Sequence, residues 1–166
     1  MYQFYNCLLF ALFVTVVFDA VTAQIQDRQC PYGYFQLDSQ CFKAEMSDHR
    51  TWYQAKRLCE DDDGILASPT DVFKLKEELK TRYGDATFWV GGTDEDEEGD
   101  WLWATGDRID SKYWMAMQPN NCCGGENCAL LGTAWTPPLN DNHCLNKRKF
   151  ICQVRALPPT RYVSLV

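Results

Sequence analysis

The sequence predicts an α+β domain with two helices and a set of short strands joined by long loops. Two segments with helical periodicity, residues 51–64 and 70–84, come first. From Thr87 onward, short runs of aromatic and β-branched residues alternate with clusters of Gly, Asn, Asp and Pro. Helices and strands that are separated along the chain are typical of an α+β fold.

The first helix is expected in the segment TWYQAKRLCEDDDG. Thr51 and Gln54 have the spacing of a capping box, and Trp52, Ala55 and Cys59 fall on one helical face. Gly64 ends the segment.

The second helix is expected in TDVFKLKEELKTRYG. Thr70 is the predicted N-cap, and Gly84 stands where a C-terminal glycine is common. Val72, Leu75, Leu79 and Tyr83 share the predicted apolar face.

Short strands are expected in TFWVGG, DWLWATGDRI, NCALLG and HCLNKRKFICQ. Between them, residues 106–127 form a loop that is long for so small a domain. A loop of this length is either disordered or ordered by something, and disulfides or a metal ion are the usual candidates.

The N-terminus has the pattern of a secretory signal peptide. An apolar run of 11 residues from Leu8 to Phe18 is too short to span a bilayer, and the small residues of VTA precede an expected cleavage after Ala23. Residues 1–23 are therefore predicted to be removed, which leaves 143 residues (166 − 23). Residues 24–153 would form one domain and residues 154–166 a short C-terminal tail.

Composition narrows the class of function. The net charge of −7 changes to about −6 once Asp19 is removed, which argues against nucleic acid and anionic membrane surfaces as partners. Eight of the nine cysteines remain after Cys7 is lost, and an even number in a secreted chain favours disulfides. With only two histidines and no CxxC, a zinc site is not expected.

A series of spaced motifs resembles the C-type lectin domain. They are CPYGYF, CF, the helix containing Cys59, FWVGG, WLWATG, QPN, GENC, LNDNHC and FICQ, and they extend from Cys30 to Cys152. The resemblance implies the long form of that fold, with disulfides Cys59–Cys152, Cys128–Cys144 and Cys30–Cys41.

The resemblance also implies one calcium site, which would bind sugar through neighbouring hydroxyl groups. Five side chains stand at the corresponding positions: Gln118, Asn120, Glu126, Asn140 and Asp141. All can offer oxygen ligands, which calcium prefers. In the family the bond before the proline of the tripeptide is cis, so the same is expected at Pro119.

The tripeptide QPN is a hybrid of the two family patterns. Glu-Pro-Asn accompanies mannose-type sugars and Gln-Pro-Asp galactose-type sugars, so this chain has one fewer charged ligand and is expected to bind calcium more weakly. No Trp follows the tripeptide to stack on a galactose face, which slightly favours mannose-type ligands. The family's Trp before the Asn-Asp pair is replaced by Leu139, and Trp135 is a candidate to fill its place.

Two further features leave alternatives open. Asp94, Glu98, Asn121 and Asn127 could form a second calcium site, although the acidic run 94–98 is equally compatible with a solvated turn. Cys122 and Cys123 could bond to each other or cross-link two chains into a homodimer.

The resemblance implies a secreted, calcium-dependent lectin that recognises surface glycans, in the manner of invertebrate soluble lectins of innate immunity. The alternative is a binding scaffold of the same fold that no longer binds sugar, as in venom, ice-binding and mineral-matrix proteins. An enzyme is not expected, because no Ser-His-Asp order, HExxH motif or phosphate loop is present.

Overall fold

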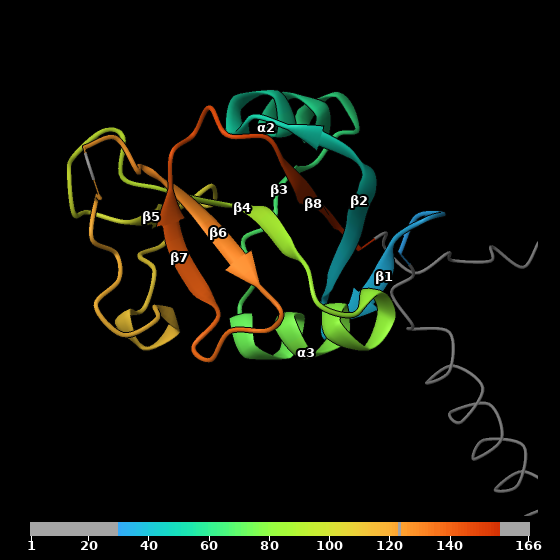
Figure 1. Cartoon of the computed structure of the whole chain (residues 1–166). Coiled ribbons are helices and arrows are strands. Elements are labelled where there is room, and N and C mark those ends of the chain that lie inside the picture. The colour runs from blue at the N-terminus through green and yellow to red at the C-terminus, as the bar shows by residue number, and fades with distance from the viewer. Residues whose placement is uncertain (1–29, 123, 157–166) are drawn as a thin grey trace, which may run out of the picture.

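The computed structural model of the protein describes residues 30–122 and 124–156 (Figure 1). The expected signal peptide, most of the C-terminal tail and Cys123 lie outside these ranges. The described elements are β1 (Phe35–Leu37), β2 (Gln40–Arg50), α2 (Trp52–Asp61), β3 (Ile65–Leu66), α3 (Val72–Tyr83), β4 (Thr87–Thr93), β5 (Leu102–Trp103), β6 (Cys128–Gly132), β7 (Leu139–Asn142) and β8 (Arg148–Arg155), with a 3-10 turn at Ser111–Tyr113. The predicted α+β class is confirmed.

Helix α2 begins with the predicted capping box. The Thr51 hydroxyl accepts a hydrogen bond from the Gln54 N–H, and the Gln54 side chain accepts one from the Thr51 N–H. The predicted face, Trp52, Ala55 and Cys59, is buried. The local sequence therefore determines both the start of this helix and the face that packs.

Helix α3 begins one residue later than predicted. Its N-cap is Asp71, whose carboxylate accepts hydrogen bonds from the backbone N–H groups of Phe73 and Lys74, at 3.0 and 3.1 Å. A carboxylate at this position also interacts favourably with the helix dipole. Thr70 instead donates its backbone N–H and its hydroxyl to Gln40 Oε1.

The end of α3 follows the prediction in part. Gly84 is the C-cap with φ of 71°, a conformation that favours glycine. Val72, Leu75 and Leu79 are buried as predicted, but Tyr83 is exposed. The predicted apolar face is one residue too long.

One sheet contains all eight strands, in the order β1-β2-β8-β4-β6-β7, with β3 paired to β8 and β5 to β4. The β4–β8 pair is parallel and the other pairs are antiparallel. The prediction that strands follow both helices is wrong for three strands, since β1 and β2 precede α2 and β3 lies between α2 and α3. Seven of the eleven residues of β2 pair with β8, near the other end of the chain, so long-range pairing rather than a local pattern defines this strand.

The core lies between the sheet and the two helices and includes the fully buried Phe42, Phe88, Trp89 and Leu131. Leu139 is fully buried in this core. Trp135 is half-buried and packs so closely on Gly132 that the indole ring leaves no room for a Cβ at this glycine.

Three predicted disulfides are present: Cys30–Cys41, Cys59–Cys152 and Cys128–Cys144. The second joins α2 to β8 across 93 positions of sequence, and closing a loop of this size stabilises the fold by on the order of 4–5 kcal/mol in the chain-entropy model. None of the helices in the described ranges is long and apolar enough to cross a membrane.

The loops between β4 and β6 gather on one side of the molecule, away from the first and last described residues (Figure 1). They contain little regular structure apart from β5 and the 3-10 turn. This loop region contains most of the predicted ligand residues.

Candidate functional site

Asp141 links β7 to the loop that carries the QPN tripeptide. It is fully buried, and its Oδ2 accepts hydrogen bonds from the backbone N–H groups of Asn120 and Asn121, at 2.8 and 2.6 Å. Hydrogen bonds to an ionised acceptor are roughly twice as strong as neutral ones. The carboxylate therefore fixes the loop against the sheet through one oxygen, and its second oxygen remains available.

The backbone N–H of Cys122 connects the side chains of Asn120 and Glu126, which are both predicted ligands. The N–H of Cys122 donates to Asn120 Oδ1 at 2.9 Å and to Glu126 Oε2 at 3.0 Å. The Gln118–Pro119 bond is cis, as the family resemblance implied. The structure thus brings Asn120, Glu126 and Asp141 together around one turn of backbone.

Three of the five predicted side chains contain a buried oxygen that accepts no hydrogen bond: Gln118 Oε1, Asn140 Oδ1 and Asp141 Oδ1. The orientation of the Asn140 amide follows from its Nδ2, which donates to the Asp141 carbonyl at 2.7 Å. A buried acceptor without a donor costs about 1–3 kcal/mol. Oxygen coordination to a cation would remove this cost, so these residues fit calcium.

The ligand set is rich in amides. Among residues 30–122 and 124–156 there is no cluster of three or more His, Cys, Asp or Glu side chains arranged to hold a metal ion. Only Glu126 and Asp141 are acidic among the five predicted ligands. A cation at this position would therefore depend on amide oxygens for much of its coordination.

The residues predicted for a second calcium site are arranged differently. Asn121 Oδ1 accepts hydrogen bonds from the N–H groups of Gly125 and Glu126, at 2.6 and 3.1 Å, and its Nδ2 donates to Glu98 Oε2 at 2.6 Å. The whole amide is therefore engaged, and it joins the acidic loop to the QPN loop. Asn127 accepts from the Thr93 hydroxyl through its backbone carbonyl, at 2.8 Å.

Asp94 differs from these neighbours because one of its oxygens has no partner. Its Oδ2 accepts the Gly99 N–H at 2.8 Å, whereas Oδ1 is buried without a donor. Burial raises the pKa of the Asp94 carboxyl, the Gly99 hydrogen bond opposes this, and the charges of Glu98 and Asp141 add to the rise. Asp94 Oδ1 is thus available to a cation at the predicted second calcium site, whereas Asn121 and Glu98 are hydrogen-bonded to each other.

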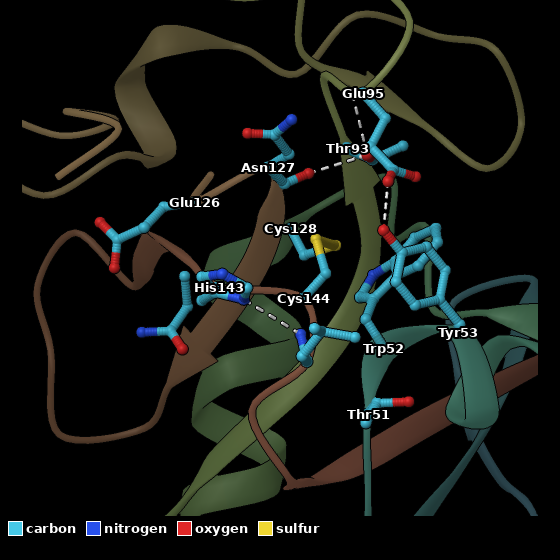
Figure 2. The surroundings of a disulfide bond; sticks show 12 residues. Thr51, Trp52, Tyr53, Thr93, Glu95, Glu126, Asn127, Cys128, His143 and Cys144 are labelled. Carbon is cyan, nitrogen blue, oxygen red and sulfur yellow. Dashed lines mark hydrogen bonds between the residues drawn. A yellow bond between two sulfur atoms is a disulfide. The ribbon is translucent and has the colours of Figure 1, made fainter. Parts of the chain in front are cut away.

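The Cys128–Cys144 disulfide lies at the base of this region and joins β6 to the segment after β7 (Figure 2). Figure 2 shows Glu126 and Tyr53 on opposite sides of it. Tyr53, on α2, donates its phenol O–H to Glu95, and this hydrogen bond raises the pKa of Tyr53 to about 12, with smaller contributions from burial and the Glu95 charge. Helix α2 is thereby tied to the acidic loop.

Sequence reasoning missed the structural part played by Asn121 and the Cys122 N–H. Asn121 has φ of 43°, a left-handed conformation that Asn tolerates better than most residues. An Asn before a glycine-rich run, here Gly124 and Gly125, was the available signal. His49 and His143 are both exposed, and neither belongs to the predicted ligand set.

The chain belongs to the C-type lectin family, since the model of the lectin C-type domain matches residues 48–154. The members of this family are in general binding proteins and not enzymes. Among curated proteins, C-type lectin lectoxin-Lio3 from Erythrolamprus poecilogyrus is 32% identical over 140 residues, which cover 78% of this chain and 84% of the relative.

Solved structures give the same fold. The carbohydrate-recognition domain of the mouse scavenger receptor C-type lectin matches with a TM-score of 0.66 and 29% identity, over 76% of this chain and 98% of that one. A calcium-independent type II antifreeze protein matches with a TM-score of 0.67 and 26% identity, over 78% of this chain and 96% of that one. The similar proteins therefore include both a carbohydrate-recognition domain and a protein named for another activity.

Proposed function

We propose that this protein is a secreted, calcium-dependent lectin that recognises surface glycans, microbial ones in particular, through the QPN loop. The observation that carries the proposal is the set of buried, unpartnered oxygens on Gln118, Asn140 and Asp141. Asn140 and Asp141 are adjacent on β7, and Gln118 precedes by two residues Asn120, whose N–H donates to Asp141. The fold itself has no need for three such unpartnered acceptors in one region. Its disulfides are typical of proteins that fold in an oxidising compartment, which supports secretion.

The calcium ligands in this proposal are Gln118, Asn120, Glu126, Asn140 and Asp141. Two neighbouring sugar hydroxyls would each give a lone pair to a calcium ion held by these residues. The side chains around it read the same hydroxyls, since carboxylates accept hydrogen bonds and amide groups donate them. Recognition therefore depends on the spacing and orientation of the hydroxyl groups and not on ligand charge.

The hybrid tripeptide determines the donors and acceptors offered to the sugar. Gln118 and Asn120 each supply one oxygen and one NH₂ group, so both ends of the tripeptide donate as well as accept. The segment after the tripeptide contains Gly124 and Gly125 and no aromatic side chain. We expect a slight preference for mannose-type over galactose-type sugars, because no ring is present there to stack on a galactose face.

Binding at one such site is expected to be weak. A small, solvent-exposed site gives dissociation constants in the millimolar range, about −4 kcal/mol. Effective recognition of a glycan surface requires several sites, because linked sites raise avidity without new contacts.

The test is retention on mannose-agarose and galactose-agarose, first with calcium and then with EDTA. Retention that EDTA abolishes is expected on the mannose resin at least. Failure to bind either resin in calcium, with intact folding, would contradict the proposal.

The second candidate function is that of a scaffold that binds protein, mineral or ice and not sugar. The amide-rich ligand set favours it, and so does the similarity to a calcium-independent antifreeze protein. In this case neither resin would retain the protein. Calcium would then still raise Tm if the five residues bind the ion for stability alone.

A further inference from the structure

A cavity of about 440 Å³ lies where β4 and β8 begin side by side. Its lining comes from the end of β2, the segment before β4, the β6–β7 turn and the first residues of β8. It shares no residue with the five predicted calcium ligands. Its volume lies in the range of small-ligand sites.

The cavity is basic although the whole chain is acidic. Lys147, Arg148, Lys149 and His49 line it, and Asp85 is its one acidic residue. Asp85 already pairs with Lys80 at 3.5 Å, so its charge is partly compensated from outside the cavity. The local balance is therefore positive in a protein with a net charge of −7.

These basic side chains are not paired with carboxylates, and the Arg148 guanidinium donates only to the Lys147 carbonyl, at 3.4 Å. Most other Lys and Arg side chains of the described ranges, such as Lys43, Lys74 and Arg108, lie within 4.0 Å of a carboxylate. Within the same ranges, no ion pair involves Lys147, Arg148 or Lys149. Three adjacent like charges repel one another, so the fold gains nothing from placing them together.

An aromatic wall completes the cavity. Trp135 is half-buried, lines the cavity and is held rigidly by its close contact with Gly132. Thr87 and Ala134 are uncharged residues of the same lining. A rigid indole beside cations suits a ligand with both an apolar face and a negative group.

We infer that this cavity binds an acidic saccharide, with its sulfate or carboxylate group on Lys147 and Lys149 and its ring against Trp135. A saccharide fits better than a bare inorganic anion because the indole wall contributes nothing to the binding of an ion. Since no calcium ligand is involved, binding is independent of calcium and would persist if the proposed lectin activity failed. Binding is also sensitive to salt, because exposed charges are screened over about 10 Å at 0.1 M ionic strength.

The test is retention of the whole protein on dextran sulfate-agarose in EDTA at low salt, with neutral dextran-agarose beside it. We expect retention on the sulfated resin alone, and elution as salt rises. Competition by polygalacturonate would show that a carboxylate serves as well as a sulfate, whereas its failure would restrict the site to sulfate esters. Single-stranded DNA at equal charge should compete poorly, and equal competition would refute recognition of a saccharide.

Charge reversal locates the site. The double variant Lys147→Glu and Lys149→Glu should weaken binding by about tenfold or more, since carboxylates with the same sign of charge as the ligand then face it. Arg155→Glu is the single-charge control, because Arg155 is exposed at the other end of β8. If the double variant kept full retention while its Tm stayed normal, the inference would be wrong.

The variant Trp135→Phe tests the contact with the saccharide ring separately from the contact with its charged group. It should lower affinity for dextran sulfate more than affinity for inorganic sulfate, and remove any ligand-induced change in tryptophan fluorescence. An unchanged fluorescence response would exclude Trp135 from the site.

Discussion

Replacing Asp141 by Asn should abolish calcium binding while leaving the fold nearly as stable as before. Asp141 uses Oδ2 to hold the N–H groups of Asn120 and Asn121, and its Oδ1 is buried without a donor. An Asn can accept the same two hydrogen bonds through its one oxygen. Its NH₂ group then stands where the available oxygen was, and an NH₂ group cannot coordinate a cation.

The magnitude follows from linkage. A dissociation constant of about 1 mM is typical of extracellular calcium modules, so about 10 mM calcium should stabilise the wild-type fold by about 1.4 kcal/mol. For a domain of this size that corresponds to a rise in Tm of about 4–7 °C. The variant should show a rise below about 1 °C.

In EDTA two effects of the substitution oppose each other. The hydrogen bonds to the loop lose their ionic character, which weakens them, but a buried charge is also removed, which stabilises the folded state. We therefore expect the Tm of the variant in EDTA to lie within about 3 °C of the wild-type value.

The assay is thermal unfolding of both proteins in EDTA and in a calcium series, with calorimetric titration as a check. Asp61→Asn is the charge-matched control, since Asp61 is exposed at the end of α2. A wild-type calcium response in the Asp141 variant would refute the assignment of this residue as a ligand. Loss of the calcium response in the Asp61 variant would show that the response depends on net charge and not on ligation by Asp141.

Three further predictions concern neighbouring residues. A carboxylate is added to the tripeptide by Gln118→Glu or by Asn120→Asp, so each variant should bind calcium about tenfold more tightly. Gln118→Glu should favour retention on mannose-agarose, and Asn120→Asp retention on galactose-agarose. Asn121→Asp keeps the acceptor oxygen but sets a second carboxylate against Glu98, so it should lower Tm in EDTA by a few degrees and enlarge the rise in Tm that calcium causes. Asn121→Ala should lower Tm by the same amount in EDTA and in calcium. Equal losses of Tm for the two variants in both conditions would argue against a latent second site. Tyr53, whose pKa is raised to about 12 by its hydrogen bond to a carboxylate, should ionise late in an absorbance titration, and this phase should vanish in Tyr53→Phe. Because the folded-state pKa is raised, the stabilisation by the neutral phenol is complete below pH 10 and disappears as pH rises through about 12.

The order of elements could be predicted only where local patterns determine it. Thr51 and Gln54 predicted the start of α2 because both hydrogen bonds of a capping box lie within four residues. By contrast β2 was missed, since QCFKAEMSDHR has no regular alternation and its pairing with β8 is interrupted by a bulge between Glu45 and Arg50. Propensity for strand depends strongly on such long-range packing.

The sequence by itself determined the family, the two helices and the positions of the predicted ligands along the chain, whereas the disulfide pairing was implied only by the family resemblance. These features depend on residue identity and on spacings within short segments. Only the tertiary structure decided how the oxygen atoms are used. Unpartnered acceptors are present on Gln118, Asn140 and Asp141. The Asn121 amide, by contrast, is hydrogen-bonded to backbone N–H groups and to Glu98. Only the tertiary structure shows the basic cavity as well, since four separate segments of the chain surround it. The physical reason is that hydrogen bonding and charge compensation depend on which groups meet in space.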